Sequence, residues 1–129
     1  MIAVDANAVV ALLVDEAELG SFGRAIYSQH DLAAPDLLSY EVTNTLQKLC
    51  RNQRLTVRAA ERALNDMSLL RLSTVPYENL GARIWELRDN VSAYDSAYVA
   101  VAEFFNVPLL TFDQRLQRAP GPTCEFVAI

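Results

Sequence analysis

With 129 residues, of which 52% are hydrophobic and 21% charged, the chain has the composition of one folded domain, expected to span residues 1–129. This composition excludes extensive disorder, and the sequence shows neither an apolar run of about 18 residues that would span a membrane nor a secretion signal, so a cytoplasmic protein is expected. The net charge of −5 argues against a protein that binds nucleic acid only through a basic surface.

The cysteines and the histidine point to no zinc site and no thiol-based active site. Cys50 and Cys124 lie far apart in the sequence, no CxxC motif is present, and His30 is the only histidine. Two reduced thiols without a disulfide are expected. Catalysis by a Ser-His-Asp or Cys-His arrangement is therefore poorly supported.

Apolar patterns along the chain predict strands that alternate with helices. The expected elements, in chain order, are a strand at 2–5, helices over 7–14 and 16–28, a strand at 32–35, helices over 36–49 and 57–70, a strand at 71–76, helices over 80–87 and 92–105, and strands at 107–113 and 124–129. Thr56 is the expected cap of the fourth helix. This order is typical of an α/β domain with a mainly parallel sheet and right-handed crossovers.

Four of the 16 acidic residues stand at positions where a solvent-exposed helix face or loop does not explain them. Asp5 and Asp113 each follow an apolar strand, and ligands of parallel sheets bind beyond the carboxyl ends of the strands. The alternative is that each residue only caps the helix that follows it. Both interpretations stay open for these two residues.

The other two acids lie within helical patterns. Asp95 is the only charged residue between Asp89 and Glu103, and its S-x-x-D spacing from Ser92 also matches a capping box. Glu41 lies beside an apolar stripe, where a partly buried carboxylate is costly unless it is paired or binds a metal. An ion pair with an arginine is the structural alternative for Glu41.

Together, the four acids predict a metal site. Carboxylates that converge repel one another and shift towards their protonated forms unless a cation neutralises them. A ligand set made only of oxygen suits Mg²⁺ or Mn²⁺. Such ions activate water and offset the charge on a reacting phosphate, so the pattern favours phosphodiester hydrolysis.

The acidic net charge does not contradict a nucleic-acid substrate. Without these four acids, 16 − 4 = 12 acidic residues face 11 Lys and Arg, so the rest of the molecule is close to neutral. Four arginines cluster around one predicted turn and the start of the next helix: Arg51, Arg54, Arg58 and Arg62. This cluster is either a surface that contacts RNA or a partner, or simply a solvent-exposed face.

Three blocks of the sequence resemble the PIN-domain ribonucleases, and most closely the VapC-type toxins of bacterial toxin–antitoxin pairs. The blocks are VDANAVVALL, PDLLSYEVTNTL and SAYDSAYVAVAEFFNVPLLTFDQRL, in this order over nearly the full length. The resemblance implies a PIN-like, three-layer α/β/α domain. Its central, mainly parallel sheet would have four to five short strands flanked by helices.

The resemblance also implies roles for individual residues. The family's metal-ligand positions match Asp5, Glu41, Asp95 and Asp113. Asn7 and Thr111 match polar positions that would orient ligands or water, and Asn44 either shares this role or lies on the helix surface. Some members carry another acid two positions after the last one, where this chain has Arg115. The number of metals, one or two, and a contact of Arg115 with phosphate therefore stay open.

The expected function is that of a metal-dependent endoribonuclease toxin that hydrolyses RNA with metal-activated water. Its implied partners are structured RNA, a second copy in a homodimer and an antitoxin whose C-terminal segment covers the acidic cleft; no membrane association is expected. One alternative is a catalytically degenerate PIN-like module that only binds protein. A phosphoacceptor signalling domain is disfavoured, because it needs a lysine at the end of a late strand and the only lysine is Lys48, within a predicted helix.

Overall fold

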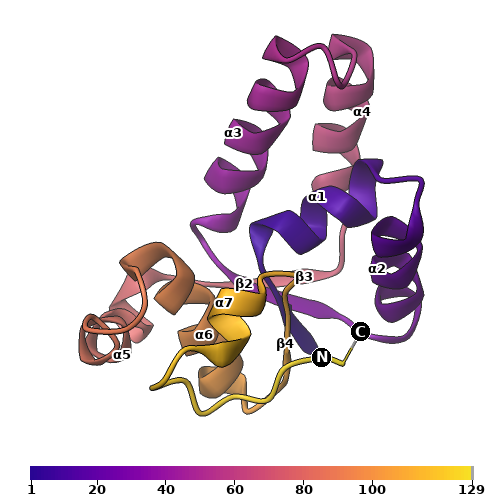
Figure 1. The fold of residues 1–129 in the computed structure, drawn as a ribbon. Helices are drawn as coiled ribbons and strands as arrows, with labels where there is room; N and C mark the ends of the chain where they lie inside the picture. The colour runs from indigo at the N-terminus through magenta and orange to yellow at the C-terminus, as the bar shows by residue number, and fades with distance from the viewer. Residues whose placement is uncertain (129) are drawn as a thin grey trace.

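Four short parallel strands form one sheet in the computed structural model, which describes residues 1–128 (Figure 1). The strands are β1 (Ile2–Val4), β2 (Leu32–Pro35), β3 (Leu72–Val75) and β4 (Leu109–Leu110). Their spatial order is β3-β2-β1-β4, and every neighbouring pair is parallel. The expected α/β class with a mainly parallel sheet is confirmed.

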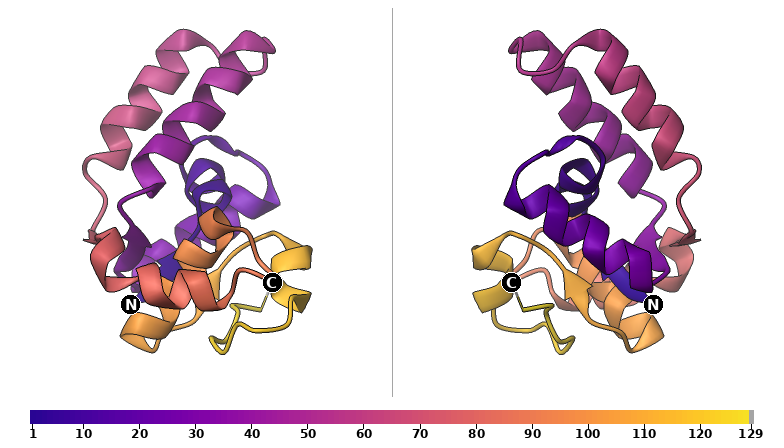
Figure 2. Two further views of the ribbon diagram at one scale, coloured as in Figure 1. Left: turned by 90° about the vertical axis from the view of Figure 1, so that its left-hand side faces the viewer. Right: turned by 90° about the vertical axis from the view of Figure 1, so that its right-hand side faces the viewer.

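Helices lie on both sides of the sheet. They are α1 (Ala6–Val14), α2 (Glu18–Gln29), α3 (Leu38–Arg51), α4 (Val57–Met67), the 3₁₀ helix η1 (Tyr77–Asn79), α5 (Gly81–Glu86), α6 (Ala93–Phe105) and α7 (Gln114–Arg118). α6 contacts β1, β2 and β4, and α5 packs on α6. α1 to α4 gather on the other side, where the α3–α4 hairpin projects away from the sheet (Figures 1 and 2).

Apolar periodicity explains why these segments fold as they do. All residues of β1 and β2 are buried, as expected for parallel strands covered on both faces. On α3, the side chains of Leu38, Val42 and Leu46 are almost completely buried along one stripe. The Thr56 hydroxyl accepts a hydrogen bond from the Ala59 backbone N–H at 3.1 Å, which confirms the predicted cap of α4.

The helix α6 is buried on nearly all sides, as its apolar sequence predicts. Every residue from Ser96 to Ala102 is buried. Asp95, in the first turn of the helix, is half-buried. Within residues 1–128, no helix combines the length and the apolar character that a membrane span needs.

The strand order places a topological switch point beside β1. From β1 the chain crosses to β2 and then to β3 on one side, whereas β4 joins β1 on the other side. In open parallel sheets, the crevice beyond the carboxyl ends of the strands at such a point is the usual place for a ligand. Asp5 follows β1 and Thr111 follows β4, so the sequence places polar side chains at this crevice.

The C-terminal strand predicted over 124–129 is shorter than expected. Among the described residues of this segment, only Phe126 forms a bridge, with Leu109; Ile129 lies outside the described residues. The strand predicted over 107–113 likewise shrinks to Leu109–Leu110. Pro108, before β4, has no N–H to donate, so the ladder between β4 and β1 cannot continue at this end of β4.

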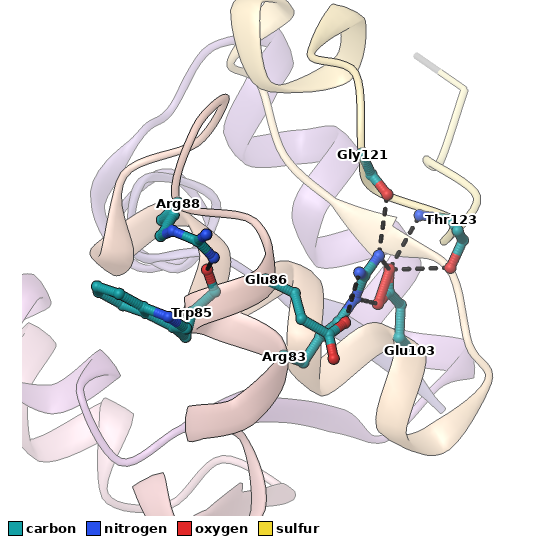
Figure 3. Close-up of polar contacts among 7 residues, drawn as sticks. All are labelled: Arg83, Trp85, Glu86, Arg88, Glu103, Gly121 and Thr123. Carbon is teal, nitrogen blue, oxygen red and sulfur yellow. Dashed lines mark hydrogen bonds and ion pairs between the residues drawn. The ribbon is translucent and has the colours of Figure 1, made fainter.

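A polar cluster holds the segment before this bridge (Figure 3). The guanidinium of Arg83 on α5 binds both carboxylate oxygens of Glu103 on α6, at 2.6 and 3.1 Å, and donates to the Gly121 carbonyl at 2.9 Å. The backbone N–H and the hydroxyl of Thr123 both donate to Glu103 Oε2 at 2.9 Å. The cluster of Arg83, Glu103 and Thr123, called the α5–α6 clasp below, joins two helices to the C-terminal segment.

Candidate active site

Asp5 and Thr111 meet at the ends of β1 and β4. The register pairs Val4 with Leu110, so the next residue of each strand comes side by side. The Thr111 hydroxyl donates a hydrogen bond to Asp5 Oδ2, and it accepts one from the Asp113 backbone N–H at 3.1 Å. Asp5 is only 8% exposed and Thr111 is fully buried, so Thr111 supports Asp5 from the interior of the protein.

Asp5 and Asp113 also cap helices, as the alternative interpretation predicted. Asp5 Oδ1 accepts a hydrogen bond from the Ala8 backbone N–H at 2.9 Å at the start of α1. Asp113 Oδ1 accepts from the backbone N–H of Arg115 at 2.9 Å and of Leu116 at 3.4 Å. Capping and a place at the site are therefore compatible for both acids.

Asp95 lies in the first turn of α6 and is half-buried. Its backbone N–H donates to the Ser92 hydroxyl at 3.1 Å, which is the first half of the predicted capping box. The Ser92 side chain also acts on the Asp95 carboxylate, whose pKa it lowers.

The three aspartates influence one another electrostatically. Burial raises the pKa of Asp5, and the charges of Asp95 and Asp113 add to this, although hydrogen bonds from Thr111 and Ala8 act in the opposite direction. Burial also raises the pKa of Asp95, and the charge of Asp113 raises it further. A side-chain hydrogen bond with Ser92 acts in the opposite direction and lowers the pKa. The charge of Asp113 thus reaches both Asp5 and Asp95, and a bound cation would offset this repulsion.

Glu41 is hydrogen-bonded to a tyrosine and not to the arginine considered from the sequence. The Tyr98 hydroxyl on α6 donates to Glu41 Oε1 on α3 at 2.5 Å. Burial, the bond to Glu41 and the nearby charges of Glu41, Asp5 and Asp95 raise the pKa of Tyr98 above its ordinary value of 10.0. Tyr98 therefore stays protonated at neutral pH and acts as a donor.

One pocket of about 180 Å³ brings most of the predicted residues together. It is lined by Asp5, Ala6, Asn7, Glu41, Asn44, Thr45, Lys48, Asp95 and Tyr98. Thr111 lies behind Asp5 and does not line the pocket. Asp113 does not line it either, but its charge acts on Asp5 and Asp95, which do. Arg115 is exposed on α7 and is not part of the lining.

The donors of this pocket fit a hard divalent cation in their chemistry. Three carboxylates line it: Asp5 after β1, Glu41 on α3 and Asp95 on α6, and all their donor atoms are oxygens. Within residues 1–128, however, no three Asp, Glu, His or Cys side chains are close enough to enclose a metal ion together. Mg²⁺ commonly binds through one or two carboxylates and keeps several waters, so an open arrangement of this kind is compatible with it.

Besides the apolar Ala6, three pocket residues were not identified as site residues from the sequence: Thr45, Lys48 and Tyr98. A helical pattern was available for two of them, because Glu41, Asn44, Thr45 and Lys48 recur at i, i+3, i+4 and i+7 on one face of α3. Tyr98 falls in an apolar helix, where a core position is the simpler interpretation. The arginine cluster (Arg51, Arg54, Arg58 and Arg62) is exposed and contributes nothing to this pocket.

Comparison with known proteins identifies the family. The sequence model of the PIN domain matches residues 2–122. Ribonuclease VapC9 of Mycobacterium tuberculosis is 35% identical over 129 residues, which cover 100% of this chain and 98% of the relative. The chain belongs to the VapC ribonucleases of the PIN-domain family. The resemblance to VapC-type toxin ribonucleases stated from the sequence motifs is thereby confirmed.

Solved structures show the same fold. PAE2754 from Pyrobaculum aerophilum has a TM-score of 0.66 and 29% identity, covering 89% of this VapC-type chain and 76% of that chain. VapBC2 from Rickettsia felis, solved with a DNA fragment from its promoter, has a TM-score of 0.67 at 16% identity and covers 98% of both chains. The PIN-like architecture expected from the resemblance is confirmed.

Proposed function

We propose that this VapC-type ribonuclease is a metal-dependent endoribonuclease that uses Mg²⁺ or Mn²⁺ at an open, hydrated site formed by Asp5, Asp95, Asp113 and Glu41. The observation that carries the proposal is the convergence of carboxylates whose charges disfavour one another. Asp5, Glu41 and Asp95 line one pocket, and the charge of Asp113 contributes to the raised pKa of both Asp5 and Asp95. A divalent cation relieves this repulsion.

Each residue of the site has a defined task in this proposal. Thr111 holds Asp5 through Oδ2, and the α1 N-terminus holds it through Oδ1, so the Asp5 carboxylate is fixed in direction. A bound divalent cation supplies Lewis-acid chemistry, activating water and offsetting phosphate charge. Glu41 is the group we assign to accept a proton from the attacking water.

Two exposed polar residues of the pocket, Asn7 and Lys48, have proposed roles in binding the substrate. Asn7 and Lys48 are exposed and line the same pocket as the acids. Lys48 supplies a positive charge for an RNA phosphate, and Asn7 supplies hydrogen bonds to water or to the substrate. Together they orient the phosphodiester against the carboxylates.

The test is the loss of RNA cleavage when single acids are neutralised. Asp5→Asn and Asp95→Asn keep the side-chain shape, and we expect folded proteins that lose RNA cleavage and no longer arrest growth. The loss should exceed the roughly 10–100-fold that removal of an outer-shell partner costs. Sequencing of RNA ends after induced expression measures it, and the exposed Asp89→Asn variant serves as the matched control. Variants that cut RNA at the wild-type rate in Mg²⁺ would overturn the assignment.

A catalytically degenerate protein-binding module is the second candidate. It is favoured by one observation: within residues 1–128 no three possible ligands are close enough to enclose a metal ion. Titration with Mn²⁺ separates the two candidates, because only the nuclease is expected to show saturable binding and thermal stabilisation.

We also propose two protein partners, a cognate antitoxin and a second copy of this chain. Toxin-family membership supports the antitoxin. For the second copy, the structure offers an apolar groove of about 370 Å³ between the start of α3, η1 and the start of α6. Tyr40, Tyr77 and Tyr94 line it and are 77%, 68% and 63% exposed, which is unusual for large side chains on one face. The cytoplasmic location expected from the sequence stays a prediction.

A further inference from the structure

Tyr98 lines the acidic pocket, but the proposed mechanism gives its hydroxyl no role. Tyr98 lies one turn after Asp95 on α6 and is 2% exposed, yet it lines the pocket. Its hydroxyl reaches across to α3 and donates to Glu41 Oε1 at 2.5 Å. A buried tyrosine hydroxyl needs a partner, and here the partner is a proposed ligand of the metal site.

Glu41 depends on this bond more than Asp5 depends on any single partner. Asp5 is held by Thr111 and by the Ala8 backbone N–H, through two different oxygens. Glu41 has a longer side chain with more rotatable bonds, so holding it in one direction costs more conformational entropy. The hydroxyl on the rigid, buried helix α6 supplies that restraint.

We propose that Tyr98 is a positioning residue that fixes Glu41 through Oε1 and thereby presents Oε2 to a divalent cation. This inference rests on the proposed metal-dependent function. It predicts that Tyr98 acts only through Glu41, and that its contribution is visible in metal binding as well as in cleavage. A tyrosine that merely fills the core would affect stability and leave metal affinity unchanged.

The experiment compares Tyr98→Phe, Glu41→Gln and the double variant. The phenylalanine keeps the ring and removes only the hydroxyl. Mn²⁺ affinity is measured by calorimetry well below the melting midpoint of each variant, and steady-state cleavage of an RNA substrate gives kcat and KM. We expect Tyr98→Phe to weaken Mn²⁺ binding about 10-fold or more and to lower kcat while KM stays within about twofold. The double variant should be no worse than Glu41→Gln.

Tyr27→Phe is the matched control, because the Tyr27 hydroxyl also makes a hydrogen bond, with the Arg71 backbone N–H, but away from the pocket. It should bind Mn²⁺ like the wild type. If Tyr98→Phe keeps wild-type affinity and kcat while Glu41→Gln loses both, the inference is wrong and the proposed function stands. Losses that add in the double variant would show that Tyr98 acts independently, which also overturns the inference. No saturable Mn²⁺ binding by the wild type would overturn both proposals.

Discussion

Asp5 serves two purposes through its two carboxylate oxygens. Oδ1 caps α1, and Oδ2 accepts a hydrogen bond from the buried Thr111 hydroxyl. Burial and neighbouring acids raise the pKa of Asp5, so its ionised form is unfavourable in the metal-free fold. An ionised, buried residue of this kind lowers the free energy of unfolding of the metal-free protein, while it provides a group that can bind a cation.

Asp5→Asn should therefore stabilise the metal-free protein at neutral pH. The folded-state pKa of Asp5 lies above its ordinary value of 3.8. The protonated side chain therefore stabilises the fold fully at pH values below 3.8, and this stabilisation is lost as the pH rises through the folded-state pKa. Asparagine caps a helix about as well as aspartate does. We expect the melting temperature at pH 7 in chelator to rise by a few degrees, and the gain to vanish near pH 4.

Thermal unfolding at both pH values, followed by circular dichroism, measures this effect. Asp89→Asn, at an exposed position, is the control and should show no gain at either pH. An equal gain at both pH values, or a lower melting temperature at pH 7, would contradict the explanation by burial of charge.

At the scale of elements, the α5–α6 clasp joins helices to the chain end through one carboxylate. Glu103 accepts from the Arg83 side chain and from both donors of Thr123 (Figure 3). Burial alone would raise the pKa of Glu103, but the hydrogen bonds from Arg83 and Thr123 outweigh it and the net pKa is lowered. The ionised form is therefore the one that stabilises the fold.

Glu103→Gln should weaken this clasp. The Glu103 and Arg83 side chains are only 15% and 31% exposed, so we expect a loss of about 1–2 kcal/mol in the free energy of unfolding, measured with urea. Asp31→Asn, which removes the charge from an ion pair with side chains 53% and 63% exposed, is the matched control and should cost less than about 0.5 kcal/mol. Equal losses would show that the clasp adds nothing beyond a surface ion pair.

At the scale of the whole molecule, the strand order decides where the acids meet. The crossovers place β1 between β2 and β4, so side chains from the two ends of the sequence reach one crevice. The apolar groove beside η1 and the acidic pocket share no lining residue, although the starts of α3 and α6 contribute to both. A dimer contact limited to the lining of the groove would therefore not include the residues that line the acidic pocket.

Tyr77→Lys should separate the proposed dimer. Tyr77 lines the groove, is 68% exposed and lies outside the acidic pocket, so a buried lysine charge would oppose association without altering the acids. Light scattering coupled to size exclusion should show a monomer. Leu69→Lys, at a 73% exposed position that does not line the groove, should remain dimeric. A Tyr77→Lys variant that stays a dimer would place the interface elsewhere.

Local patterns in the sequence were sufficient for most of the elements and for the chemistry of the site. The caps at Asp5, Thr56 and Asp113 were predictable because each involves residues at most three positions apart. The apolar stripe of α3 and the buried α6 were predictable from helical periodicity. The family motifs identified the acids as candidates, and their roles as metal ligands stay predictions.

Only the tertiary structure decided which side chains meet. Thr111 and Asp5 are 106 positions apart, and Tyr98 and Glu41 are 57 apart, so no local rule joins them. The structure also decided that Asp113 does not line the pocket and that the C-terminal segment forms a single bridge. The sequence by itself determined the elements and the chemical nature of the acids, because these depend on near neighbours. The contacts depended on the strand order and on helix packing, which bring distant residues together.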